Sequence, residues 1–200
     1  MTRNLFVSIA LLFAGSVLCA QEEFFPKNAF ESDSRADQFM SAWFSDELRI
    51  LGEPSLFQMS KAPFDEEYRF LWLRTFHHPI AIRLELRSDG VGILTTKVAS
   101  GSAGFPQKKP YLIEKVSRPL TREQTQRFLG RLDKLSFWNL RQDVDQRTGN
   151  DGSEWIIEGV KGGKYQMLSR WTPIEGAVHE LGLTFAFGSA QMSIPKNEVY

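Results

Sequence analysis

The chain has 200 residues, 24 basic and 24 acidic side chains, 42% hydrophobic residues and a single cysteine. A chain of this length buries about 70% of the surface that its unfolded form exposes, which suffices for one domain without disulfides. The balanced charge offers no basic field for nucleic acid, so we do not expect a nucleic-acid partner.

The first twenty residues, 1–20, have the pattern of a cleavable secretory signal peptide. Arg3 gives a positive start, an apolar run follows from Leu5 to Leu18, and Ala20 precedes a polar segment. This run is shorter than the roughly 20 apolar residues of a transmembrane helix. We therefore expect cleavage after Ala20 and a periplasmic or secreted protein with no transmembrane anchor. A lipid anchor at Cys19 is the less favoured alternative, because lipoprotein signals have a small residue where Leu18 stands.

Cleavage after Ala20 removes the only cysteine and Arg3, which leaves a net charge of about −1. The mature chain then has no disulfide, thiol nucleophile or thiolate metal site. We expect residues 21–31 to be a flexible leader, residues 32–190 a single domain and residues 191–200 a C-terminal tail.

The first predicted element of the domain is an amphipathic helix. Ser32 and Asp33 are good N-cap residues, and Gly52 begins the stop signal. Between them, apolar residues recur near the 3.6-residue period of a helix: Ala36, Phe39, Met40, Trp43, Phe44 and Leu51. This aromatic stripe favours core packing, and a partner-binding face is the alternative.

Strand signals follow the first helix. Residues 68–76 alternate two sets of strand formers, which predicts a strand buried on much of both faces. Residues 80–86 alternate apolar and polar side chains, and a Ser-Asp-Gly turn at 88–90 leads to a paired strand over 91–98. A fourth strand is predicted over 111–117.

The second half of the domain repeats helix and hairpin signals. Thr121 and Gln124 form a capping-box pattern that begins a second helix. A second hairpin is predicted over 153–160 and 164–171, and a third helix over 178–186. Because short turns join strands in antiparallel pairs, we predict an α+β fold, a mainly antiparallel sheet of five to six strands with about three helices packed on it, covering one face.

One block of the sequence resembles a known family. A D-G-x-x-W-x-x-E-G pattern begins at Asp151, followed by Tyr165 and an R-W-x-P pattern that ends at Pro173. This block is similar to one in a family of uncharacterised exported bacterial proteins, and the similarity runs from about Tyr68 to Ala186. These proteins have no established activity. The resemblance therefore implies an exported α+β domain and transfers no catalytic residue.

Four acidic residues have the spacing of ligands in a calcium-binding loop: Asp143, Asp145, Asp151 and Glu154. Arg147 replaces the ligand at the fifth position, and Thr148 replaces the turn glycine. We interpret the segment as a solvated loop and predict no metal site there.

Three histidines supply the only imidazoles: His77, His78 and His179. Adjacent strand residues point to opposite faces, so His77 and His78 cannot easily share one ion. Glu154 and Glu158 lie about 13 Å apart on an ideal strand, beyond the roughly 5 to 9.5 Å between glycosidase carboxyls. We interpret both glutamates as exposed strand carboxylates and Trp155 as a core residue.

Two glycine-containing segments have functional alternatives. Lys161–Lys164 resembles part of a phosphate loop, but Tyr165 and a strand follow, which indicates a hairpin turn. Gly101–Gly104 is predicted to be a flexible loop. Because no reactive groups converge, we expect a non-catalytic binding or envelope-associated domain, without a cofactor, that contacts a protein or envelope partner. The alternatives are an exported hydrolase with a site near His77 and His78, or an enzyme-inhibitor-like module using the Gly101–Gly104 loop.

Overall fold

The structure is a computed structural model that describes residues 22–62, 66–105, 108–142, 149 and 151–200. The predicted signal peptide lies outside the described residues. Within these ranges, no helix combines the length and the apolar character needed to span a membrane.

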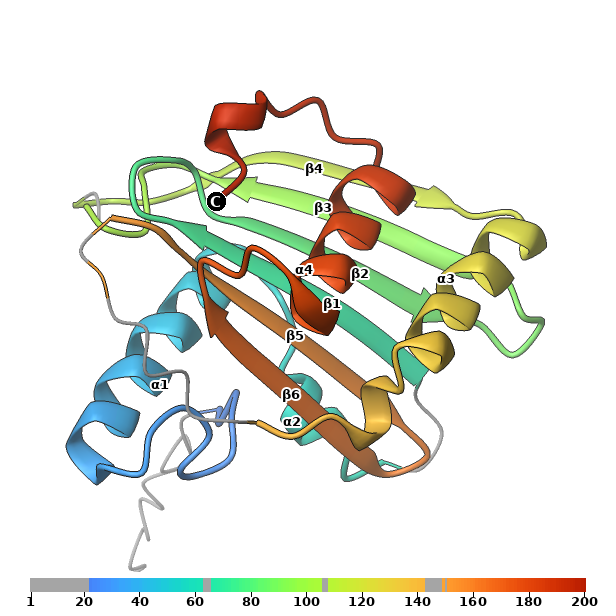
Figure 1. Cartoon of the computed structure of the whole chain (residues 1–200), viewed down its shortest axis with the longest axis horizontal. Coiled ribbons are helices and arrows are strands. Elements are labelled where there is room, and N and C mark those ends of the chain that lie inside the picture. The colour runs from blue at the N-terminus through green and yellow to red at the C-terminus, as the bar shows by residue number, and fades with distance from the viewer. Residues whose placement is uncertain (1–21, 63–65, 106–107, 143–148, 150) are drawn as a thin grey trace, which may run out of the picture.

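A six-stranded antiparallel sheet forms the centre of the described molecule, with strand order β4-β3-β2-β1-β5-β6 (Figure 1). The strands are β1 (Glu66–Arg74), β2 (Ile80–Leu86), β3 (Gly92–Ala99), β4 (Leu112–Pro119), β5 (Ser153–Lys161) and β6 (Lys164–Trp171). Both predicted hairpins are present, and the C-terminal hairpin pairs with β1, with Trp72 opposite Trp155. The prediction of an α+β fold with five to six strands and about three helices is confirmed.

One face of the sheet is covered by α3 (Arg122–Lys134), α4 (Gly176–Leu183) and a π-helical turn, η2 (Thr184–Ser189). The predicted capping box of Thr121 and Gln124 is present at the start of α3. Trp155 is 1% exposed in this core. A Cβ atom on Gly182 would lie 2.2 Å from the Trp155 ring, so the close approach of α4 to the sheet requires glycine there.

The opposite face is covered by α1 (Ser34–Ile50) and by the short α2 (Leu56–Met59). In Figure 1, α2 lies behind the sheet and α1 extends past its edge at the lower left. The expectation that helices cover one face only is therefore wrong. The physical reason lies in the central strands, since β1 is buried on both faces. Leu71 and Leu73 of β1 join the core that contains Phe44 and Leu48 of α1.

The segment 22–31 differs from the flexible leader expected from the sequence. Phe24, Phe25 and Phe30 are buried in the core beneath α1. The Asp37 carboxylate of α1 accepts hydrogen bonds from the backbone N–H groups of Asn28 at 2.8 Å and Phe30 at 2.9 Å. This segment is therefore part of the folded domain.

The last ten residues also pack against the domain. The backbone oxygen of Tyr200 accepts hydrogen bonds from the indole N–H groups of Trp72 at 3.2 Å and Trp155 at 2.9 Å. The Tyr200 hydroxyl lies 2.7 Å from Nδ1 of His77. The segment predicted as a tail thus contacts the core on the face that α4 covers.

Candidate binding cleft

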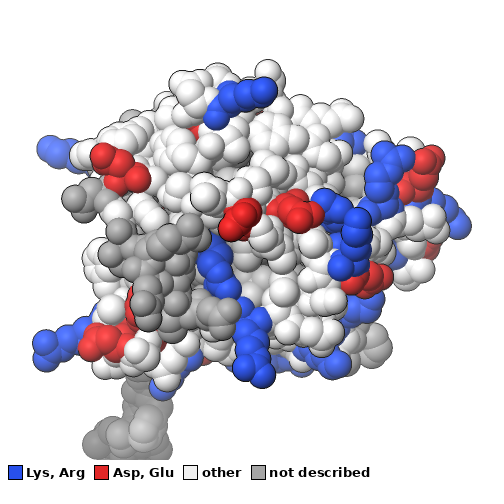
Figure 2. Space-filling model, in the orientation of Figure 1, with Lys and Arg blue, Asp and Glu red and all other residues white. Residues whose placement is uncertain are grey.

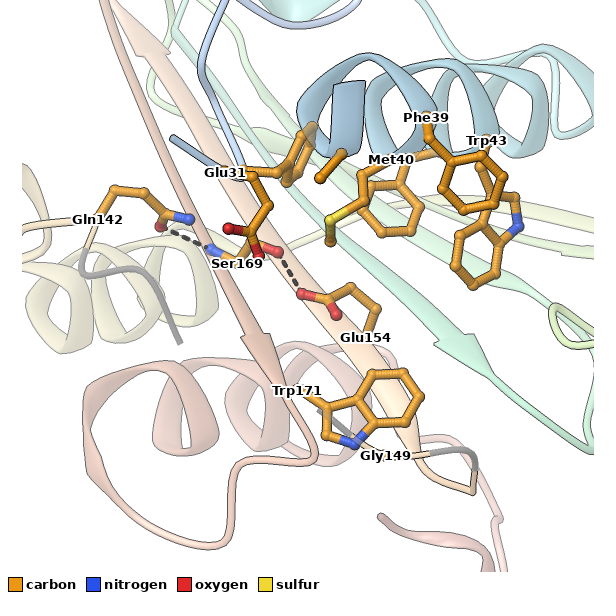
Figure 3. Close-up of a pocket in the computed structure, with 12 residues that line it drawn as sticks. Glu31, Phe39, Met40, Trp43, Gln142, Gly149, Glu154, Ser169 and Trp171 are labelled. Atoms are coloured by element: carbon orange, nitrogen blue, oxygen red, sulfur yellow. Dashed lines mark hydrogen bonds between the residues drawn. The ribbon is translucent and has the colours of Figure 1, made fainter. Parts of the chain in front are cut away.

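A cleft of about 320 Å³ lies between α1 and the β5–β6 edge of the sheet (Figure 3). Aromatic side chains form much of its lining: Phe30, Phe39, Trp43, Phe44 and Trp171. Polar side chains lie among them: Glu31, Gln142, Glu154 and Ser169. The cleft therefore combines apolar walls with hydrogen-bonding groups, as small-molecule and side-chain pockets do.

The aromatic stripe of α1 forms one wall because the stripe extends past the part of the helix that packs on the sheet. Its C-terminal part, including Phe44 and Leu48, is buried. Its N-terminal part is only partly buried, and Phe39 is 68% exposed. The rings of Phe39 and Trp43 pack 6.2 Å apart at the rim. The interpretation of the stripe as core is thus wrong for Phe39, whereas Met40 and Trp43 are partly buried and pack against the core.

The floor of the cleft comes from the sheet. Glu154 of β5 and Ser169 of β6 are both buried, and the Ser169 hydroxyl donates a hydrogen bond to the Glu154 carboxylate. The Ser169 backbone N–H donates to Oε1 of Gln142 at 2.9 Å. The interpretation of Glu154 as an exposed carboxylate is therefore wrong. Asp143 and Asp145 of the proposed calcium spacing lie outside the described residues.

Trp171 forms the wall opposite α1. A Cβ atom on Gly152 would lie 2.7 Å from the Trp171 ring and 2.3 Å from Oγ1 of Thr172, so only glycine allows this packing. Gly152 and Trp171 both belong to the block from Asp151 to Pro173, for which a family resemblance is predicted. Part of that block thus builds the cleft, although the sequence alone gave no indication of the contact.

Glu158 is also buried, with 0% of its surface exposed, and it lies in a closed network of charges. Its carboxylate accepts hydrogen bonds from Nε and Nη2 of Arg69 at 2.8 and 2.5 Å, and from the Tyr165 hydroxyl at 2.8 Å. Burial raises the pKa of Tyr165, and the negative charge of Glu158 adds to the rise, so this phenol stays protonated. The expected exposure of Glu158 is wrong.

The network continues through Glu53, which follows α1. Its carboxylate lies 3.0 Å from Nε of Arg83 and 2.7 Å from Nζ of Lys97. It also lies 3.7 Å from Nη1 of Arg69. Nη1 of Arg83 lies 2.5 Å from Glu67. These contacts pair buried and partly buried cations with buried anions, as charges taken out of water require.

The three histidines contact different groups. Nδ1 of His77 contacts the Tyr200 hydroxyl, and its Nε2 lies 3.4 Å from the Glu198 carboxylate. His78 uses Nδ1 in a 2.6 Å hydrogen bond with the backbone oxygen of Gly101, and the His179 ring packs 5.7 Å from the Trp155 ring. Across the described ranges, no group of three or more potential metal-ligating side chains is found.

The Gly101–Gly104 loop is tied to the end of β1, which differs from the flexible loop expected. The N–H groups of Ala103 and Gly104 donate to the backbone oxygens of Arg74 and Thr75, each at 3.2 Å, and Ala103 is buried. Lys161–Lys164 forms the predicted hairpin turn, in which Gly162 and Gly163 both have positive φ.

Comparison with known proteins finds no family model that matches the chain and no curated protein with significant sequence similarity. The resemblance carried by the block from Asp151 to Pro173 therefore stays a prediction.

Proposed function

We propose that the protein is an exported, non-catalytic binding domain that holds an aromatic or bulky aliphatic side chain of a partner protein in the cleft between α1 and β6. The observation that carries this proposal is the convergence of three partly exposed aromatic side chains, Phe39, Trp43 and Trp171, around one cavity. Exposed aromatic residues that surround a pocket are typical of the energetically dominant contacts of protein interfaces.

The size of the cleft supports this choice of ligand. Its volume of about 320 Å³ is near the lower limit of ligand pockets, which range from about 300 to 1,000 Å³. That space suits one ring or one large side chain. Aromatic walls hold a ring through offset or edge-to-face contacts, which contribute about 0.5 to 1.5 kcal/mol per pair beyond the area they bury.

The polar floor supports binding over catalysis. The Ser169 hydroxyl donates a hydrogen bond to the Glu154 carboxylate, and His77 and His78 contact other groups. A serine nucleophile needs a base that removes its proton and donors for the developing oxyanion. The described lining of the cleft includes no imidazole. Its polar atoms fit an orienting role.

Titration with N-acetyl-tryptophanamide, a soluble mimic of an aromatic side chain, tests this function. Phe39→Ala should weaken binding by about tenfold, which corresponds to about 1.4 kcal/mol. Phe76→Ala is the matched control, because Phe76 is 53% exposed and does not line the cleft. No binding by the unmodified protein, or an equal loss in both variants, would overturn the proposal.

Export is the second part of the proposal, and it is supported by the charged start, apolar run and small residues of the first twenty positions. N-terminal sequencing of the protein from its native host should begin at Gln21. A first residue of Met1 would contradict export by this route, and a lipid-modified Cys19 would indicate the anchored form.

A further inference from the structure

A second cavity, of about 410 Å³, lies between α3 and the π-helical turn η2, on the face of the sheet opposite the cleft. Its inner surface includes Leu120 and Phe128, which are buried. Its rim includes Arg127 and Arg131 of α3. The cavity thus places two guanidinium-bearing side chains above an apolar floor.

The two arginines are four residues apart, so they share one face of α3. Nη2 of Arg127 lies 2.8 Å from the Glu123 carboxylate, and both side chains are strongly exposed. Nη2 of Arg131 lies 2.5 Å from Glu180. Ion pairs at the surface contribute only about 0 to 1 kcal/mol, so an arriving anion can engage these guanidiniums at little cost.

The wall opposite α3 has an unusual backbone. η2 is a π-helical turn, and the Ala190 N–H donates to the backbone oxygen of Phe185 at 2.8 Å. Gln191, which lines the cavity, has φ of 56°, in the left-handed region that non-glycine residues rarely adopt. The Arg118 guanidinium donates to the backbone oxygen of Ser189. Short π-helical turns and such backbone outliers occur frequently at functional sites.

The charge around the cavity favours an anion. The charged side chains that line the cavity are both basic, Arg127 and Arg131, and the carboxylates that pair with them, Glu123 and Glu180, are not among its lining residues. Figure 2 shows Lys and Arg side chains, with Asp and Glu side chains among them, on the side of the molecule where α3 lies. Guanidinium groups bind carboxylate and phosphate oxygens through parallel hydrogen bonds, with more geometric specificity than lysine provides.

We infer that this cavity binds an oxyanion, a carboxylate or a phosphate monoester, carried on a small apolar group. Arg127 and Arg131 contact the anionic oxygens, and the apolar group lies against Phe128 and Leu120. This site is separate from the cleft between α1 and β6, and its existence does not depend on the function proposed for that cleft.

Isothermal titration at about 0.15 M salt, where the Debye length is about 8 Å, tests the inference without long-range electrostatics. The probes are phenyl phosphate, phenylacetate and the uncharged benzyl alcohol. Phenyl phosphate or phenylacetate should bind, and the tighter of the two identifies the class of oxyanion. No binding of either anion, or benzyl alcohol binding as tightly, would overturn the inference.

Two double variants distinguish a specific site formed by Arg127 and Arg131 from general electrostatic attraction to α3. Arg127→Gln with Arg131→Gln should weaken binding of the preferred anion at least tenfold, about 1.4 kcal/mol. Arg122→Gln with Lys134→Gln removes the same charge from the same helix, and neither residue lines the cavity. This control should change the affinity less than about twofold. An equal loss in both double variants would show general attraction to α3 and would overturn the inference.

Discussion

Glu154 and Glu158 lie on the same face of β5, four residues apart, and both are buried. Their surroundings differ. Glu158 contacts Arg69 and Tyr165 in a network covered by α2 and the segment that follows α1. Glu154 lies under the cleft, beside the partly exposed aromatic residues of α1. The same residue type, at equivalent strand positions, thus belongs to a closed ion network in one place and to an open cavity in the other.

The elements that cover the sheet decide the role of a strand carboxylate. The closed network supplies partners for every charge that it buries, which is the condition for keeping ions out of water. The cleft instead leaves aromatic surface in contact with solvent. We therefore expect changes in the network to lower stability and changes at the cleft rim to affect binding.

The largest effect is expected from breaking the network. Arg69→Met leaves the Glu158 carboxylate buried beside an apolar side chain, which should lower the free energy of unfolding by about 3 to 5 kcal/mol in chemical denaturation. The double variant Arg69→Met with Glu158→Gln removes both charges and should recover much of that loss. A single-variant loss below about 1 kcal/mol would show that the network is not closed to water.

A similar loss of unfolding free energy is expected from a substitution in the core on the other face of the sheet. Trp155→Ala removes a ring that packs 5.1 Å from the Phe70 and Trp72 rings, so the cavity left behind should cost about 3 to 5 kcal/mol. Phe39→Ala, at the cleft rim where the ring is exposed, should cost about 1 kcal/mol or less in the same denaturation experiment. Equal losses would remove the distinction between core and cleft aromatic residues.

A smaller, pH-dependent effect is expected from Glu47 of α1. Burial raises the pKa of Glu47 from 4.5 to about 7, the negative charge of Asp46 adds to the rise, and a hydrogen bond with the Trp43 side chain opposes it. Between these two values the folded state holds a proton that the unfolded state has lost. Stability should therefore fall as pH rises from 4.5 to 7, by at most about 3 kcal/mol.

The Glu47→Gln variant isolates this effect, because its side chain is uncharged at every pH. The difference in unfolding free energy between variant and unmodified protein should be near zero at low pH and should favour the variant at pH 8. Denaturation in urea at both pH values measures it. A difference that does not change with pH would contradict the raised pKa.

The strands and helices could be predicted because their signals are local. Alternation located both hairpins, and the Thr121 capping box located α3. The second covered face was missed, although residues 68–76 already showed strand formers on both faces. Phe24, Phe25 and Phe30 were missed as core residues because they follow no helical or strand period. Local patterns do not state which helix covers which face.

The contacts that define the buried ion network and the cleft join residues from different elements. No local sequence pattern therefore predicts them. Arg69 and Glu158 are 89 residues apart in the chain, so their pairing depends on the register of β1 with β5. The exposure of Phe39 depends on where α1 extends past the edge of the sheet. Helical periodicity in the sequence does not predict that position. The approach of Gly152 to Trp171 likewise follows from the strand pairing.

The most direct test of a ligand cleft that is separate from the core uses the indole N–H resonances of the tryptophans, which NMR resolves individually. Trp43 and Trp171 line the cleft, whereas Trp72 and Trp155 are buried in the core of the other face. Addition of N-acetyl-tryptophanamide should shift the signals of Trp43 and Trp171 in a saturable manner and leave those of Trp72 and Trp155 unchanged. Shifts of all four signals together, or of none, would show that the cleft is not a binding site separate from the core.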